Sequence, residues 1–350
     1  MKAYYFRHLL KFKIPSGTSR GVLNDKESWF IIITSGDNYG IGECSLIKGL
    51  SPDPDANFEL KLKDICNKIH LGFANLSLEL KSYPAILFGL ETAFRSFESK
   101  DPFVFSKSKF TKGEDSLSIN GLIWMGEKSF MKRQINEKIQ SGFNCIKIKV
   151  GALNFNLECE ILKSIRSEYS ESDIELRLDA NGSFSLGSAI EKLKKLSAFK
   201  IHSIEQPISV KKWQEMAFLC DKSPIPIALD EELIGISDFN EQKKMLIEIN
   251  PAYIILKPSL IGGLEKADDW IKLASSLNIQ WWSTSALESN IGLNAISQWV
   301  FNKRPFLRQG LGTGMLFTNN IESPYFIENG FLKYNSDAAW NSDFFKHFIS

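Results

Sequence analysis

The stretch GFNCIKIKVG, residues 142–151, decides how the middle of the chain is interpreted, because it places two lysines inside an apolar run. Side chains of a strand alternate between two faces, so Lys147 and Lys149 share one face and the isoleucine and valine side chains share the other. Lysines in such a run often protect the exposed edge of a sheet. The surrounding sequence favours a closed barrel, which has no edge and whose apolar outer face packs on helices. We therefore expect both lysines to point into a barrel.

Eight strand-like segments follow one another from about residue 116, with amphipathic helical stretches between them. They are SLSING (116–121), CIKIKV (145–150), IELRLDA (174–180), IHSIEQP (201–207), IPIALD (225–230), AYIILKP (252–258), IQWWSTS (279–285) and FLRQGL (306–311). From Lys149 to Ser285, polar residues at the strand ends recur every 25 to 30 residues, which is the length of one βα unit. The pattern predicts an α/β barrel over residues 113–315, with its site at the carboxyl ends of the strands.

The first third of the chain follows a different pattern. SWFIIITSGDNYGIGECSLI, residues 28–47, reads as two strands joined by a turn, and helical spacing follows over 56–70 and 84–99. These segments predict an α+β domain over residues 1–112. The polar stretch SKSKFTKGEDS, residues 106–116, is typical of the linker that leaves it.

Composition excludes several classes of function. The 350 residues carry a net charge of +1, which provides no global field for nucleic acid or an acidic membrane, so we expect small-molecule partners. The five cysteines form no CxxC pair, which argues against a disulfide framework and a zinc cluster. The chain shows neither the apolar core of a signal peptide nor a membrane-spanning run. A cytoplasmic protein is expected, and a homo-oligomer is compatible with this sequence.

Three acidic residues close three consecutive predicted strands: Asp179, Glu205 and Asp230. Each alone could be a helix cap or a surface acid. Because neighbouring strands lie ~4.8 Å apart, the three carboxylates together should converge on one cation. All-oxygen ligation suits Mg²⁺ or Mn²⁺ and leaves positions open for a substrate carboxylate.

The histidines lie away from these strand ends or on the opposite strand face, so lysines must transfer protons. Lys257, in IILKPSLIGG, approaches from the far side of the barrel. A metal flanked by ammonium groups is suited to removing a proton next to a carboxylate and stabilising the enediolate.

The motifs KIKVG, LDANGSF, IEQP, ALDEE and LKPSLIGG, in this order, resemble those of the muconate-lactonizing subgroup of the enolase superfamily. YGIGECSLIKGLS resembles the capping-domain signature of that superfamily. The resemblance implies a modified TIM barrel, (β/α)7β, with an α+β capping domain of residues 1–112 completed by the tail 316–350. INGLIWMG, TSALESNIGL and PSGTSRGVLNDKESWF are most similar to the o-succinylbenzoate synthase family, the dehydratases of menaquinone biosynthesis.

The resemblance implies roles for individual residues. Asp179, Glu205 and Asp230 would bind Mg²⁺. Lys149 would transfer the proton, Lys147 would orient and tune it, and Lys257 would stabilise the enediolate. The remaining expected site residues are Asn181, which supports the metal ligands, and Thr284, Ser285, Gly310 and Arg20, which bind substrate.

Arg20 is the least constrained of these residues. It is the only arginine of a loop that could act as a lid, and it could pair with a second substrate carboxylate or simply be solvated.

Other functions stay open at this point. The same fold serves muconate cycloisomerases, N-acylamino-acid racemases and dipeptide epimerases. Dipeptide epimerases carry an Asp-x-Asp pair after the last strand, where this chain has Gly312, Thr313 and Gly314. A barrel that only binds a ligand is an alternative of another class, although no predicted ligand or lysine is missing here.

Overall fold

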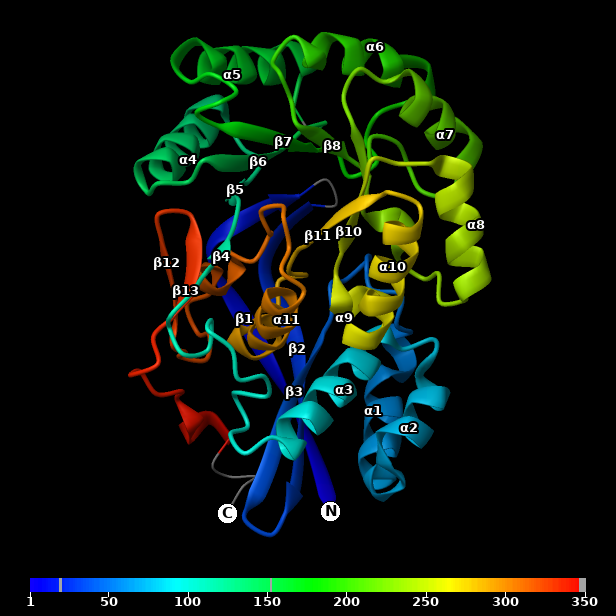
Figure 1. Cartoon of the computed structure of the whole chain (residues 1–350), viewed down its shortest axis with the longest axis vertical. Coiled ribbons are helices and arrows are strands. Elements are labelled where there is room, and N and C mark those ends of the chain that lie inside the picture. Colours follow the sequence, from blue (N-terminus) through cyan, green and yellow to red (C-terminus); the bar gives the residue numbers. More distant parts are fainter. Residues whose placement is uncertain (19–20, 152, 346–350) are drawn as a thin grey trace.

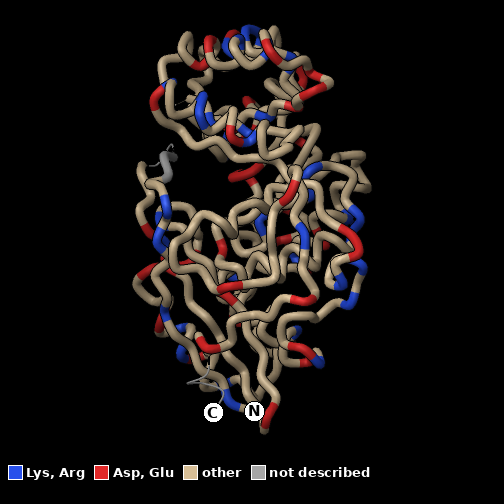
Figure 2. The backbone as a smooth tube through the Cα atoms, turned by 90° about the vertical axis from the view of Figure 1, so that its left-hand side faces the viewer, with Lys and Arg blue, Asp and Glu red and all other residues tan. Residues whose placement is uncertain are grey.

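The computed structural model describes residues 1–18, 21–151 and 153–345, and it has the predicted fold class: a modified TIM barrel with an α+β cap. Figure 1 shows the three-stranded cap sheet and helices α1 to α3 at one end, and the barrel with α4 to α8 around it at the other. The amino terminus lies at the cap end, as Figure 2 also shows in a view turned by 90°.

The cap consists of one antiparallel sheet with helices on it. Its elements are β1 (Lys2–Thr18), β2 (Gly21–Ser35), β3 (Asn38–Ser45), α1 (Phe58–Asn67), α2 (Gly72–Ser77) and α3 (Pro84–Glu98). The predicted hairpin is confirmed, with its turn at Gly36. Helix α3 packs closely on β3, because a Cβ on Gly42 would lie only 1.9 Å from the Gly89 carbonyl oxygen. Glycine at this position is therefore required for the contact.

The barrel sheet is parallel and follows chain order. Its strands are β5 (Gly121–Ile123), β6 (Cys145–Lys149), β7 (Glu175–Asp179), β8 (Ser203–Glu205), β9 (Ile227–Leu229), β10 (Tyr253–Leu256) and β11 (Gln280–Ser283). The helices are α4 (Lys128–Gln140), α5 (Phe155–Glu168), α6 (Leu186–Ser197), α7 (Trp213–Lys222), α8 (Phe239–Ile249), α9 (Pro258–Ile261), α10 (Leu264–Ser276) and α11 (Asn290–Asn302). The outward apolar residues of the strands form one continuous core with these helices.

The eighth predicted strand closes the barrel through two single bridges. Gln309 pairs with Ile119 on one side, and Gly310 pairs with Thr284 on the other, both in parallel orientation. The prediction for the first strand is partly wrong: Leu117–Ser118 (β4) pairs outside the barrel with β13, and the barrel strand begins after it. The chain changes partner within SLSING, which sequence periodicity does not register.

The carboxyl-terminal segment contacts both parts of the molecule. Strands β12 (Tyr325–Glu328) and β13 (Phe331–Tyr334) form a three-stranded sheet with β4, in the order β12-β13-β4. Phe317 forms a single bridge to Phe12 of the cap. Phe110, inside the expected polar linker, is fully buried and stacks on Phe301, so this linker is anchored. The division at residues 112 and 315 stays a prediction.

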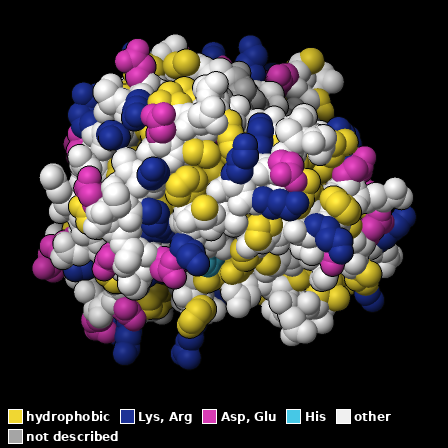
Figure 3. Space-filling model, turned by 90° about the horizontal axis from the view of Figure 1, so that it is seen from above, with side chains coloured by type: hydrophobic (Ala, Val, Ile, Leu, Met, Phe, Trp, Pro, Cys, Tyr) yellow, Lys and Arg dark blue, Asp and Glu magenta, His cyan; other side chains and the backbone are white. Residues whose placement is uncertain are grey.

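The surface view from the barrel end shows Lys and Arg side chains interspersed with Asp and Glu, which agrees with the near-zero net charge (Figure 3). Within the described ranges, none of the helices combines the length and apolar character needed to span a bilayer.

Candidate active site

A cavity of about 140 Å³ lies at the carboxyl ends of the barrel strands. Three lysines from β6 and the end of β10 line it: Lys147, Lys149 and Lys257. Leu23, Ile47 and Leu50 of the cap also line it. The cavity therefore lies between the barrel, which contributes these three lysines, and the cap, which contributes these apolar groups and Lys48.

The strand register places the lysines against the acidic residues, as the period of two predicts. Lys149 pairs with Asp179 along β6 and β7, and Asp179 pairs with Glu205 along β7 and β8. Lys149 Nζ lies 2.9 Å from Asp179 Oδ2 and donates to Asn181 Oδ1 at 2.7 Å. Lys147 Nζ contacts Asp179 Oδ2 at 3.0 Å and also binds Glu205. Both lysines thus share one carboxylate.

Lys257 approaches the opposite side of the group. Its Nζ lies 2.5 Å from Oδ2 of Asp230, which directly follows β9. The other oxygen of Asp230 and the Oε1 atom of Glu205 are buried and have no hydrogen-bond partner among the described residues. A buried carboxylate oxygen without a partner is costly, and a cation beside these two atoms would offset that cost.

The three carboxylates fit a divalent cation by their chemistry. They are hard oxygen donors on adjacent strands, which Mg²⁺ prefers. As arranged in the described residues, they are drawn to the lysine ammonium groups and do not converge as a preformed metal cluster. The lysine ammonium groups therefore pair with the same carboxylates that a metal ion would bind.

The electrostatics of the centre follow from burial and from these pairs. Burial opposes the charge on Lys147, but the carboxylates of Asp179, Glu205 and Asp230 raise its pKa above the ordinary lysine value. Burial likewise opposes ionisation of Asp179, yet the three lysines hold its pKa well below the usual range. Burial raises the pKa of Asp230, and Lys257 lowers it. The pKa of Asp230 is therefore raised overall, and the positive charge of Lys257 limits that rise.

Two non-glycine residues with left-handed backbone shape the loops after β7 and β8. Asn181 has φ 43° and Gln206 has φ 37°. Asparagine tolerates this region, whereas for glutamine it costs of order 1–3 kcal/mol. The Gln206 amide offsets that strain, because its oxygen accepts from the backbone of Asp230 and its nitrogen donates to Glu232. Gln206 therefore fixes the turn that presents Asp230.

The structure places three of the four expected substrate-binding residues in the cavity wall. Thr284, Ser285 and Gly310 line the cavity. Thr284 Oγ1 donates to the Gly310 carbonyl at 3.0 Å, and Ser285 Oγ donates to Glu288 at 2.5 Å. Arg20 lies outside the described residues.

Sequence reasoning missed other residues of the wall. Glu231 lines the cavity and accepts from the Asn181 amide at 2.9 Å. Asn120 and Thr313 also line it, and one buried side-chain oxygen of each has no partner among the described residues. The acidic run after IPIAL was a signal for Glu231, but nothing local distinguishes Asn120 or Thr313 from ordinary loop residues.

Comparison with known proteins agrees with this geometry. The model of the family "Enolase C-terminal domain-like" matches residues 131–337. An o-succinylbenzoate synthase from Desulfotalea psychrophila is 43% identical, over 95% of this chain and 98% of its own length. The crystal structure of MenC from D. psychrophila superposes with a TM-score of 0.85 at 40% identity, over 95% of this chain and 99% of that one.

The likeness to a more distant structure shows the fold alone. A dipeptide epimerase from Cytophaga hutchinsonii, solved with Mg and the dipeptide D-Ala-L-Val, superposes with a TM-score of 0.83 at 20% identity, over 99% of this chain and 97% of that one. The family match covers more than half of the chain, and the 43% identical relative is matched over nearly its whole length. This chain belongs to the enolase C-terminal domain-like family.

Proposed function

We propose that this protein is a Mg²⁺-dependent dehydratase that converts 2-succinyl-6-hydroxy-2,4-cyclohexadiene-1-carboxylate to 2-succinylbenzoate, a reaction of menaquinone biosynthesis. The observation that carries the specific reaction is the 43% identity to an o-succinylbenzoate synthase over 95% of this chain and 98% of that protein. The charged centre supports the same chemistry, because it combines lysines with ligands for a hard cation.

Lys149 is assigned the proton transfer. In its neutral form, Nζ takes the proton from the carbon next to the substrate carboxylate, which leaves an enediolate. It then gives that proton to the hydroxyl on the neighbouring ring carbon, which departs as water. One C–H and one C–O bond break, and the ring becomes aromatic. Asp179 and Asn181, which hold Nζ at 2.9 and 2.7 Å, orient it for both transfers.

Asp179, Glu205 and Asp230 are assigned to hold Mg²⁺. When bound, this cation would supply positive charge to the substrate carboxylate as negative charge develops on it. Lys257, on the opposite side from Lys149, supplies a second positive charge that faces the delocalised ring. The apolar residues of the cap exclude water, which strengthens both effects.

The alternatives within the fold receive weaker support. The dipeptide epimerase likeness, at 20% identity, concerns the fold alone. The same lysines would also serve a racemase, so the experiment must include an assay for racemase activity.

The deciding assay mixes the purified protein with the cyclohexadiene carboxylate and Mg²⁺ and follows formation of 2-succinylbenzoate. A parallel assay follows exchange of the α-proton of N-acylated amino acids in deuterated water. We expect rapid dehydration and at most slow exchange. Exchange without dehydration would replace this proposal by a racemase.

The proposal includes a cytoplasmic location. All five cysteines are free thiols in the structure, and Cys44, Cys66 and Cys145 are buried. Free thiols are typical of proteins in a reducing compartment.

A further inference from the structure

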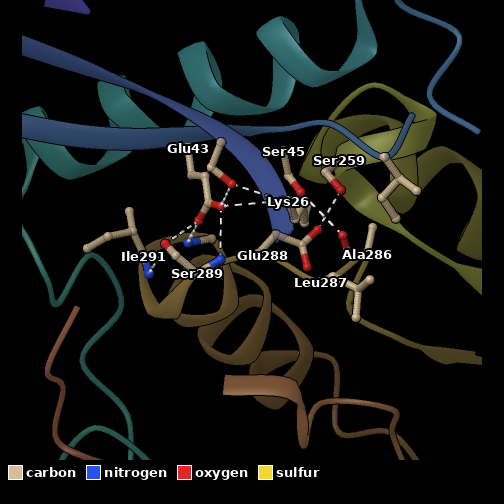
Figure 4. A network of polar contacts seen from close by, with 12 residues as sticks. Lys26, Glu43, Ser45, Ser259, Ala286, Leu287, Glu288, Ser289 and Ile291 are labelled. Atoms are coloured by element: carbon tan, nitrogen blue, oxygen red, sulfur yellow. Dashed lines mark hydrogen bonds and ion pairs between the residues drawn. The ribbon is translucent and has the colours of Figure 1, made fainter. Parts of the chain in front are cut away.

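A buried polar cluster joins the cap to the loop that follows β11 (Figure 4). We call it the joint cluster, and its members are Lys26, Ser28 and Glu43 of the cap and Ser259, Ser285, Glu288 and Ser289 of the barrel. None of these side chains is more than 8% exposed. Buried charges are costly unless they are paired. The large number of polar groups at this one contact therefore calls for an explanation.

Glu43 anchors the start of helix α11 to the cap sheet. Its Oε1 accepts from the Ser28 hydroxyl at 2.6 Å and from the Ser289 backbone at 2.9 Å. Its Oε2 accepts from the Ser289 hydroxyl at 2.5 Å and from the Gly292 backbone at 2.9 Å. A carboxylate at a helix amino terminus pairs with free N–H groups and with the helix dipole.

Glu288 connects two segments of the site. Its Oε1 accepts from the Ser259 hydroxyl, two residues after Lys257, and its Oε2 accepts from the Ser285 hydroxyl, each at 2.5 Å. Ser285 Oγ in turn accepts from the Leu287 backbone at 2.9 Å. The loop is therefore held in one conformation, which includes the positive φ of 62° at Leu287.

Lys26 supplies the only lysine ammonium within this cluster. It donates to Ser28 at 2.9 Å and lies 3.9 Å from Glu43 Oε1. Burial lowers the pKa of Lys26, while the negative charges of Glu43 and Glu288 raise it. Burial raises the pKa of Glu288, and Ser259, Ser285 and Lys26 lower it. Lys26 of the cap thus favours the charged form of Glu288, a carboxylate that belongs to the barrel.

The loop held by the joint cluster forms part of the substrate cavity. Ser285, Ala286 and Leu287 line that cavity, and Ser45 of the cap adds a hydrogen bond to the Ala286 carbonyl at 3.3 Å. The charge of Lys26 in the cap therefore influences the position of the 285–287 wall of the proposed substrate cavity.

We propose that Lys26 of the cap is a positioning residue for substrate binding: by balancing the charge of Glu43 and Glu288, it holds the 285–287 wall of the cavity in its binding conformation. This inference rests on the proposed function for its substrate. It assigns the cap a role beyond covering the site, because docking of the cap onto the barrel would also set the shape of the pocket.

Lys26→Met tests the proposal, since methionine keeps the length of the side chain and removes its charge. The wall contacts substrate away from the reacting carbon, so KM for the succinyl substrate should rise about tenfold while kcat changes less than about threefold. Adding Glu288→Gln removes the excess negative charge, and the double variant should recover most of the lost affinity. Lys194→Met, at an exposed lysine on α6, is the matched control and should match wild type.

Hydrogen–deuterium exchange of residues 284–292 gives a readout that does not depend on turnover. Lys26→Met should speed exchange there and leave α6 unchanged, and the double variant should slow it again. The proposal would be overturned by an unchanged KM, or by a fall in kcat as large as the rise in KM. It would also be overturned if the double variant were no better than the single variant in folding or in affinity. If wild type fails to dehydrate the substrate, the proposed function fails, and exchange at 284–292 still decides whether Lys26 positions the wall.

Discussion

The strand ends of the barrel and the joint between cap and barrel are both buried and charged, but they are built differently. At the strand ends, each charged residue occupies the same place in successive βα units, and neighbouring strands bring Lys149, Asp179 and Glu205 into contact. At the joint, Glu43 binds Ser289 from 246 positions away in sequence, and Lys26 lies beside Glu43. The first region follows from local periodicity and the second from the packing of whole domains.

Removal of the metal, or of the charge of one of its proposed ligands, should reduce activity more than any other change in either region. Chelation of divalent cations should abolish dehydration, and Asp230→Asn should reduce kcat by at least about 10³-fold, because the amide cannot supply the charge that holds the cation. Turnover is measured with and without chelator, and circular dichroism checks the fold. Full activity of metal-free protein would remove the metal from the account.

Lys257→Met tests the opposite side of the barrel centre. The variant keeps the packing of the side chain but removes the cation that faces the ring, so kcat should fall about 10²-fold. Lys128→Met, on a partly exposed lysine of α4 paired with Glu160, is the control and should keep wild-type rates. A normal kcat for Lys257→Met would leave Lys257 only an ion-pair partner of Asp230.

Gly263→Ala examines a second contact of the joint. Gly263 has φ 107°, and a Cβ there would lie 2.2 Å from Glu91 Oε2, which accepts from the Leu264 backbone. Strain and the weakened hydrogen bond should lower the free energy of unfolding by about 2–4 kcal/mol. Gly187→Ala, with open space around it in α6, should be neutral or stabilising in the same urea titration. Equal effects of the two variants would show that the joint tolerates a side chain.

The smallest effect concerns pH and Glu91. Burial raises its pKa to about 7 from an ordinary value of 4.5, although Arg95 lowers it. Between these two values the unfolded chain releases the proton and the folded protein keeps it, so stability falls as pH rises, by at most ~1.4 kcal/mol per pH unit. Glu91→Gln should lose this slope when unfolding free energies at pH 5 and pH 7 are compared. An identical slope in both proteins would show that Glu91 is ionised throughout.

These two regions also show how far sequence reasoning reaches. The barrel, its strand ends and the placement of Lys147, Lys149 and Lys257 in the cavity were predictable, because the period of two and the length of a βα unit are local properties. The partner change at β4 and the roles of Lys26 and Glu288 were not. Each depends on which distant segment packs beside it, and a lone Lys26 in the sequence is typical of an exposed residue.

The central claim is that Lys149 transfers the proton, and Lys149→Arg tests it most directly. Arginine keeps the positive charge near Asp179 but does not release its proton, so the base is lost while the local field remains. With the cyclohexadiene carboxylate and Mg²⁺, we expect kcat to fall by at least about 10²–10⁴-fold while binding of 2-succinylbenzoate stays close to that of wild type. A variant that keeps a tenth of the wild-type rate would show that another group takes the proton.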